Sequence, residues 1–149
     1  MRSIVISAIL IIILTVVIIN NMNRDNVDIV TDEDSVKWDG YKPTEQPRNK
    51  AGYISIPGIN KLVFKASETI QDMNIYNPGT NDVDIVFSLT IGDEEIWKSG
   101  RCKPGDGYYM VSIMKPLDEG RYGAKMHYDC YRGLAKLNGA VVDVELIVQ

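Results

Sequence analysis

The two cysteines and the single histidine carry the most reactive side chains of this sequence. Cys102 and Cys130 form an even pair, which permits a disulfide in an exported protein. In the loop-entropy account of disulfides, closing the loop between them would stabilise a fold by about 3–4 kcal/mol. The alternative is a pair of buried thiols that pack as small apolar residues. The sequence leaves both alternatives open.

Nucleophilic catalysis needs a base beside the nucleophile, and this chain offers only His127. In an extended strand, His127 and Cys130 point to opposite faces because an odd number of positions separates them. His127 lies between Lys125 and Asp129 on a predicted outer face, so we expect it to be solvated. No Ser-His-Asp triad can be built without it. We therefore predict no catalytic residues and expect that the chain is not an enzyme.

Carboxylates gather around one predicted hairpin, where they could bind calcium or act as a pair on a glycosidic bond. Asp82 and Asp84 share a strand face, and Asp93, Glu94 and Glu95 follow in the next turn. The sequence has no dense alternating acidic loop of the kind that binds calcium. We predict charged, solvated turns, no metal site and no cofactor.

Aromatic residues give the clearest indication of binding. Tyr108 and Tyr109 are adjacent on a predicted strand and face opposite sides of it, so one of them points outward. With Trp97 and Tyr131 they could form an exposed platform that stacks a sugar ring or anchors a protein partner. The alternative places Trp97 in the core and the tyrosines along a rim.

Short apolar runs separated by turn residues begin after Gly52. Gly supplies positive φ, Pro fixes φ, and Asn and Asp bond their own backbone, so these residues mark the turns. Strands at spacings of about 8–12 residues are typical of a sandwich or a barrel. The runs predict seven or eight antiparallel strands: Tyr53–Ile56, Leu62–Lys65, Met73–Tyr76, Val83–Ile91, Glu95–Cys102, Tyr108–Ile113, Arg121–Tyr131 and Ala140–Val148.

One local pattern narrows the fold class. Leu117 and Gly120 precede Tyr122 where a long strand is predicted to begin. In immunoglobulin-like sandwiches, a tyrosine at this place donates its hydroxyl to the backbone a few residues upstream, which is called a tyrosine corner. We therefore predict an all-β fold, an immunoglobulin-like antiparallel β-sandwich, over residues 51–149.

The first 22 residues are the most apolar part of the chain. Ile4–Ile19 contains no charge, and with its flanks, residues 3–22, it predicts a helix of about 30 Å that spans a lipid bilayer. The residues after this run offer no small-residue cleavage site, which favours an uncleaved signal-anchor over residues 1–22 rather than a cleaved signal peptide. We expect a single-pass protein of the cell membrane, with the N-terminus cytoplasmic and the C-terminal domain extracellular.

An acidic stretch, residues 23–50, connects the predicted anchor to the predicted sandwich. No helix or strand periodicity persists in it, so we expect a semi-extended linker. Val36 and Trp38 are among its apolar residues and could dock on another part of the chain.

Composition excludes several classes of protein. The 149 residues contain 20 acidic and 16 basic side chains, which give a net charge of −4 and argue against binding to nucleic acid. Hydrophobic residues make up 45% and charged residues 24%, so wholesale disorder is excluded. One histidine and two cysteines are too few for most zinc sites.

A set of turn and core residues carries a resemblance over residues 70–149. The matching residues are Tyr76-Asn77-Pro78, Asn81, Phe87, Leu89, Ser99-Gly100, Pro104-Gly105, Leu117, Gly120-Arg121-Tyr122 and Asn138-Gly139. On these residues the chain resembles a group of small, mostly uncharacterised membrane-anchored surface proteins of Gram-positive bacteria. The resemblance implies an extracytoplasmic sandwich behind an N-terminal hydrophobic segment, and it implies no catalytic residues. The group tends to have an apolar residue where this chain has Cys102.

These features together predict a membrane-anchored, non-enzymatic protein of adhesion or envelope assembly, whose partners are envelope or surface proteins. The alternative is a carbohydrate-binding module that holds cell-wall or host glycan on an exposed aromatic face.

Overall fold

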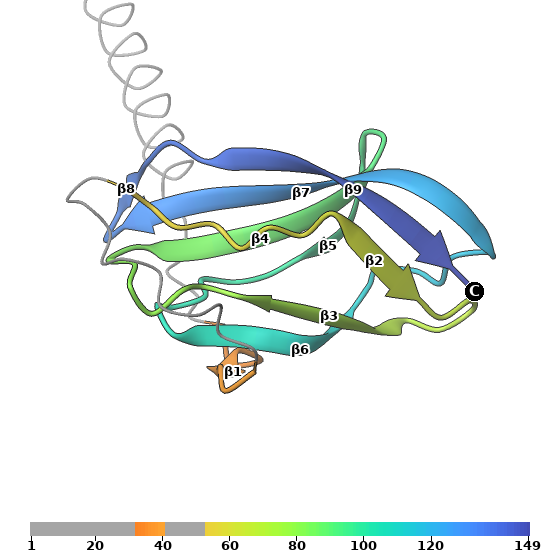
Figure 1. Cartoon of the computed structure of the whole chain (residues 1–149), viewed down its shortest axis with the longest axis horizontal. Coiled ribbons are helices and arrows are strands. Elements are labelled where there is room, and N and C mark those ends of the chain that lie inside the picture. Colours follow the sequence, from red (N-terminus) through yellow and green to blue (C-terminus); the bar gives the residue numbers. More distant parts are fainter. Residues whose placement is uncertain (1–31, 41–52) are drawn as a thin grey trace, which may run out of the picture.

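Two β-sheets pack face to face in the computed structural model, which describes residues 32–40 and 53–149 (Figure 1). The larger sheet has the strand order β2-β9-β7-β4-β5, with β8 beside β7, and the smaller sheet has the order β1-β6-β3. The strands are β1 Val36–Lys37, β2 Lys61–Phe64, β3 Ile70–Tyr76, β4 Asp84–Ile91, β5 Glu94–Lys98, β6 Asp106–Ser112, β7 Gly120–Arg132, β8 Ala135–Lys136 and β9 Ala140–Val148. The prediction of an all-β sandwich is confirmed.

Alternation of apolar and polar side chains gives each long strand one core face. Strands β4 and β7 run antiparallel, with Phe87 opposite Tyr128 and Leu89 opposite Met126. All four side chains are fully buried, and the rings of Phe87 and Tyr128 meet edge to face with their centroids 5.7 Å apart. A slip of one residue would turn all of these side chains to solvent, so the apolar pattern fixes the register.

The smaller sheet closes the core from the opposite side. Ile75 of β3 and Tyr108 and Val111 of β6 are buried against the larger sheet. The ring of Tyr108 meets Phe87 edge to face at 6.2 Å and Trp97 at 5.6 Å between centroids. Aromatic contacts therefore join β6 to both β4 and β5 across the core.

One strand pair departs from the predicted antiparallel arrangement. Strand β2 runs parallel to β9, with Lys61 opposite Glu145 and Phe64 opposite Val148. An alternating apolar pattern determines which face of a strand is buried, but not the direction of its neighbour. The prediction of a wholly antiparallel sandwich is wrong for this pair.

The segment predicted as a strand over Tyr53–Ile56 forms no strand. Its backbone bonds to a side chain instead, because Ser55 N donates to Asn81 Oδ1 and Asn81 Nδ2 donates to Ser55 O, both at 2.8 Å. Ile54 and Ile56 are partly buried and pack against the core. The apolar pattern therefore identified a segment that contacts the core but gave it the wrong backbone conformation.

A fully buried asparagine joins three turns at one end of the sandwich. Asn77 Nδ2 donates to Val83 O at 2.8 Å and to Cys102 O at 2.9 Å. Its backbone N donates to Asp106 O at 2.9 Å, and its backbone O accepts from Gly105 N at 2.8 Å. Buried polar groups are costly unless they are paired, and here one amide satisfies several of them. Asn77 therefore holds the end of β3 to the chain before β4 and to the start of β6.

Tyr122, near the start of β7, makes the contact expected of a tyrosine corner. Its hydroxyl donates to Asp118 O at 2.9 Å, and Leu117 beside this turn is buried in the core. Gly120 lies next to the ring, since a Cβ built there would be 3.5 Å from Tyr122 Cε2.

We expect Tyr122→Phe to lower the free energy of unfolding by about 0.5–1.5 kcal/mol, since the substitution removes one hydrogen bond and keeps the ring. Denaturant titration measures the difference, and Tyr53→Phe is a matched control because Tyr53 is exposed. Equal stability of the two variants would contradict a structural role for the Tyr122 hydroxyl.

The predicted membrane anchor, residues 1–22, lies outside the described residues. Among residues 32–40 and 53–149, no helix is long and apolar enough to cross a membrane.

Candidate functional site

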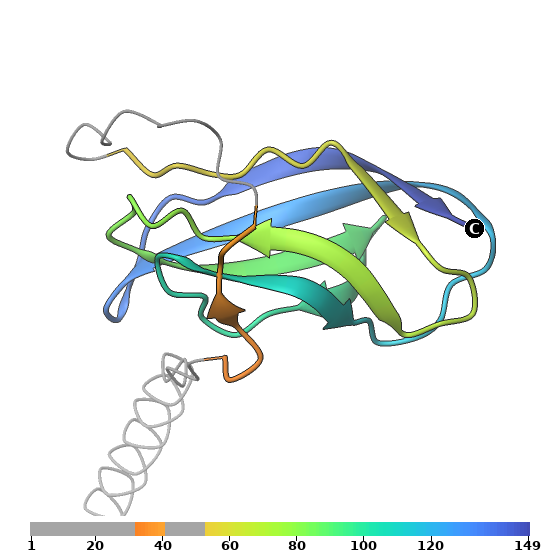
Figure 2. The ribbon, with the colours of Figure 1, turned by 60° about the horizontal axis from the view of Figure 1, so that its bottom comes forward.

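Residues 32–40, which we predicted to be part of a linker, lie against the smaller sheet (Figure 2). In β1, Val36 pairs antiparallel with Gly107, and Lys37 pairs with Asp106. The next residue continues the contact, since Trp38 N donates to Gly105 O at 3.0 Å. This part of the linker prediction is therefore corrected, because the segment adds an edge strand to β6.

The indole of Trp38 occupies the outer face of the smaller sheet between two tyrosines. It stacks on Tyr76 of β3 with ring centroids 5.0 Å apart and on Tyr109 of β6 at 4.6 Å. Gly107 makes room for it, because a Cβ at that position would lie 2.9 Å from Trp38 Cε3 and 2.6 Å from Ile75 O. The three stacked rings fix the segment on the sheet.

Charged and polar groups on both sides of Trp38 complete the contact. Asp32 Oδ2 accepts hydrogen bonds from Tyr108 Oη and from Gly100 N, both at 2.7 Å. Lys37 Nζ forms an ion pair of 2.5 Å with Asp106 Oδ1, and the Tyr109 hydroxyl donates to the carboxylate of Asp39. Burial raises the pKa of the Tyr108 hydroxyl well above its usual range, with a smaller contribution from Asp32. The phenol therefore remains a hydrogen-bond donor to Asp32.

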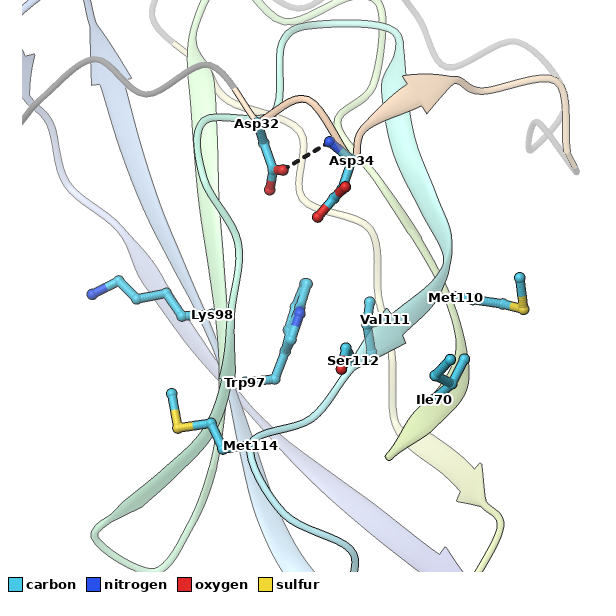
Figure 3. A pocket seen from close by; sticks show the side chains of 9 residues that line it. All are labelled: Asp32, Asp34, Ile70, Trp97, Lys98, Met110, Val111, Ser112 and Met114. Carbon is cyan, nitrogen blue, oxygen red and sulfur yellow. Dashed lines mark hydrogen bonds between the residues drawn. The ribbon is translucent and has the colours of Figure 1, made fainter. Parts of the chain in front are cut away.

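A groove of about 430 Å³ lies next to this contact, between β5 and the second half of β6 (Figure 3). The chain turns before β1, where Ser35 N donates to Asp32 O at 3.3 Å. Strand β1 then pairs only with Asp106 and Gly107, so the second half of β6 lies outside this pairing. The residues that line the groove are Asp32, Asp34, Ile70, Trp97, Lys98, Met110, Val111, Ser112 and Met114.

The groove exposes large apolar side chains at its mouth. Ile70 is 58% exposed, Met110 62% and Met114 65%. Two carboxylates, those of Asp32 and Asp34, line the same groove. An apolar surface beside a strand edge is a common place for an extended segment to bind. We take the groove and the adjoining edge of β6 as the candidate functional site.

The four aromatic residues predicted to bind a ligand do not share an exposed face. Trp97 and Tyr108 belong to the core, and Tyr109 is stacked under Trp38. Tyr131 is buried near the end of β7, where the guanidinium of Arg101 lies over its ring at 4.3 Å. The expected platform is corrected accordingly, because the one outward ring of the pair Tyr108 and Tyr109 is covered by the chain itself.

The two cysteines are free and lie on either side of one strand. Ile85 of β4 pairs with Cys130 on β7 and forms an isolated bridge with Cys102 on the other side. Two strand spacings separate the cysteine Cα atoms by roughly 10 Å, whereas a disulfide needs less than about 7 Å. Of the two alternatives left open by the sequence, the structure therefore has the two buried free thiols and not the disulfide.

We expect neither Cys102 nor Cys130 to react with iodoacetamide in the native protein at pH 8. Both thiols are fully buried, and burial raises the pKa of Cys102 to about 12 and also raises the pKa of Cys130. The thiolate is the reactive form, so reaction is slow. Mass spectrometry should find two modified thiols after unfolding and none before it; rapid native modification would contradict the buried positions.

Alkaline conditions should destabilise the fold. The pKa of Cys102 is raised from 9.0 to about 12 and that of Tyr128 from 10.0 to about 12, in both cases chiefly by burial. Between these values the unfolded chain loses protons that the folded chain retains, so stability falls as pH rises from 9 to 12. Thermal melting at pH 8, 9, 10 and 11 measures the effect; a constant melting temperature would contradict it.

Three of the candidate acid, base and metal-binding residues pair with other side chains, and the partner of Asp84 is a buried arginine. His127 Nε2 lies 3.1 Å from Thr90 Oγ1 on the outer face, as predicted for a surface histidine. Asp82 pairs with Arg132 at 2.9 Å, and Asp84 lies 3.7 Å from Arg101. In the part of the chain that the structure describes, no three His, Cys, Asp or Glu side chains are arranged to hold a metal ion.

Comparisons with protein families, with curated proteins and with solved structures return no match for this chain.

The sequence gives only a partial indication of the segment that contacts the site. Val36 and Trp38 stood out as apolar residues within an acidic stretch, but nothing in their spacing indicated where they would dock. The second half of the site, Met110 and Met114, gave no signal because methionine is common both in cores and on binding surfaces.

Proposed function

We propose that this chain is a non-enzymatic binding module that recognises protein partners along the β6 edge. The partner adds an extended strand beside β6 and places apolar side chains on Ile70, Met110 and Met114. In this proposal the module stands outside the cell membrane on an N-terminal anchor, residues 1–22, and serves in adhesion or envelope assembly. Its partners are envelope or surface proteins.

The immunoglobulin-like class is the finer fold assignment that we propose. The larger sheet contains the order β9-β7-β4-β5, which corresponds to strands G, F, C and C′ of an immunoglobulin sheet. In the smaller sheet, β3 lies beside β6 in the way that strand B lies beside strand E. The bond from Tyr122 to Asp118 supports the assignment as a tyrosine corner. Domains of this class present their sheet edges and loops to partners.

The observation that carries the proposed function is the addition of β1 to β6. A short segment of the chain, about seventy positions before β6, already binds there through backbone pairing, a stacked indole and an ion pair. The same edge continues beyond this contact into the groove. Strand addition supplies backbone hydrogen bonds for affinity, while alternate side chains enter pockets and provide specificity.

A photoreactive residue in place of Met114 tests the proposal in cells that make the protein. We expect one discrete crosslinked protein, and we expect Met110→Asp in the same chain to remove it, since a carboxylate opposes an apolar contact. The matched control carries the photoreactive residue in place of Val141, which is 56% exposed on the larger sheet.

Two results would overturn the proposal. The same product from the Val141 position would mean that the groove is not the contact, as would a product that persists with Met110→Asp. A product that contains glycan and no protein would favour the carbohydrate-binding alternative, which has less support because Trp97, Tyr108 and Tyr131 are buried.

A further inference from the structure

We propose that the segment Asp32–Gly40 also docks on β6 of a second copy of this chain, in place of that copy's own segment. This inference goes beyond the proposed function, since the exchanged segment takes the place of β1 opposite Asp106 and Gly107, whereas the surface-protein partner would bind along the groove at Met110 and Met114. The exchange of an identical element between copies is a low-cost route to a dimer, because the interactions broken within each chain form again between the two chains.

The interactions of the segment are complete in themselves. The donor side uses Asp32, Val36–Lys37, Trp38 and Asp39, and the acceptor side lies between Tyr76 and Tyr109. None of these interactions depends on which chain supplies the segment. A second copy that reaches the acceptor side therefore binds with the same pairing, the same stacked rings and the same ion pair.

The length of the chain permits both arrangements. Twelve residues, 41–52, separate Gly40 from Tyr53. A stretch of this length spans at most about 40 Å, which is more than the diameter of a small domain. The distance along the chain therefore does not restrict the segment to its own sandwich.

The docking of the segment within one chain is also weak enough to open. Only two residue pairs join β1 to β6, and Val36 is 47% exposed. Among the described residues, the buried Trp38 Nε1 has no hydrogen-bond partner, and such a group lowers the stability of the docked state. Edge elements with few buried contacts open without global unfolding. The segment can therefore leave β6 while the sandwich remains folded.

Cysteine pairs between β1 and β6 test the exchange. Lys37 and Asp106 are directly opposed, so their Cα atoms are about 4.5–5.5 Å apart, which suits a disulfide. Full-length Lys37→Cys chains with one tag are co-expressed with full-length Asp106→Cys chains with another tag. Because each chain carries one member of the pair, a disulfide between the two tags above the level of random collision requires that the segment of one copy docks on the other.

We expect the mixed-tag dimer to exceed, by at least fivefold, the dimer formed by Val141→Cys with Lys37→Cys. That control measures random collision, because Val141 is exposed on β9 of the larger sheet, which does not pair with β6. Trp38→Ala in the Lys37→Cys chain should reduce the dimer to the level of this control. A chain carrying both Lys37→Cys and Asp106→Cys should form the bond within itself, which demonstrates that the site folds.

If the double variant closes within one chain while the mixed-tag dimer stays at the collision level, the exchange is refuted. That result would leave the crosslink from position 114 unaffected, so failure of the exchange is distinguishable from failure of the proposed function. A mixed-tag dimer that survives Trp38→Ala would likewise refute the exchange, since the docked indole would not be its cause.

Discussion

Trp38→Ala is expected to release residues 32–40 from the smaller sheet without unfolding the sandwich. The substitution removes two aromatic stacking interactions, each worth about 0.5–1.5 kcal/mol beyond burial, so the free energy of docking falls by about 1–3 kcal/mol. With only two backbone pairs left in β1, the segment should detach. Hydrogen exchange measures this as a loss of protection at the amide of residue 38, which donates to Gly105 O in the native protein.

A matched control separates loss of an aromatic ring from loss of docking. Tyr53→Ala removes a ring that is 71% exposed and should leave amide exchange in residues 32–40 unchanged. In both variants, amides of β4 and β7 should keep their native protection. Unchanged protection at residue 38 in Trp38→Ala would contradict the role given to the stack, and global loss of protection would mean that the segment is part of the folding core.

Asn77→Ala is expected to lower the free energy of unfolding by about 2–4 kcal/mol, since unpaired buried polar groups cost about 1–3 kcal/mol each. The variant deprives Val83 O and Cys102 O of the Asn77 amide and removes one of the acceptors of Asn81 Nδ2. Urea titration measures the change.

Asn138→Ala is the matched control, because Asn138 is exposed and its loss should change stability by less than about 0.5 kcal/mol. A second readout checks the mechanism: Asn81 also bonds the backbone of Ser55, so Asn77→Ala should increase amide exchange at Ser55 before it affects β7. An Asn77→Ala variant as stable as Asn138→Ala would contradict the network.

The local parts of the fold were predictable because they depend on neighbouring residues. The strands of residues 84–91 and 120–132 agree with the predicted bounds to within one residue. Parity along a strand correctly indicated that Tyr108 and Tyr109 face opposite sides, and the structure shows that Tyr108 is the one buried in the core. The pattern before Tyr122 predicted a hydrogen bond from its hydroxyl to the backbone a few residues upstream, and the acceptor is Asp118 O.

The positions of the cysteines and the covering of Tyr109 depend on which strands become neighbours. Neighbouring strands can be far apart in the sequence, so local patterns do not reveal them. Cys102 and Cys130 both occupy core positions, yet Ile85 lies between them because β4 is inserted at that place in the sheet. In the same way, Tyr109 alternates with core residues along β6 and is expected to face solvent. Its ring is nonetheless covered by Trp38, which comes from a segment about seventy positions away. Periodicity describes one strand at a time, so it could identify neither arrangement.

The parallel pairing of β2 with β9 has a consequence for how the chain folds. The two strands are separated by roughly eighty residues, so β2 cannot pair with β9 until the strands between them have been made. Contacts of such high sequence separation slow folding towards milliseconds to seconds. Until β9 arrives, β2 and one edge of β7 remain open to other chains. The sandwich therefore passes through an incomplete state in which unpaired strand edges are open to aggregation until the last partner of β2 is in place.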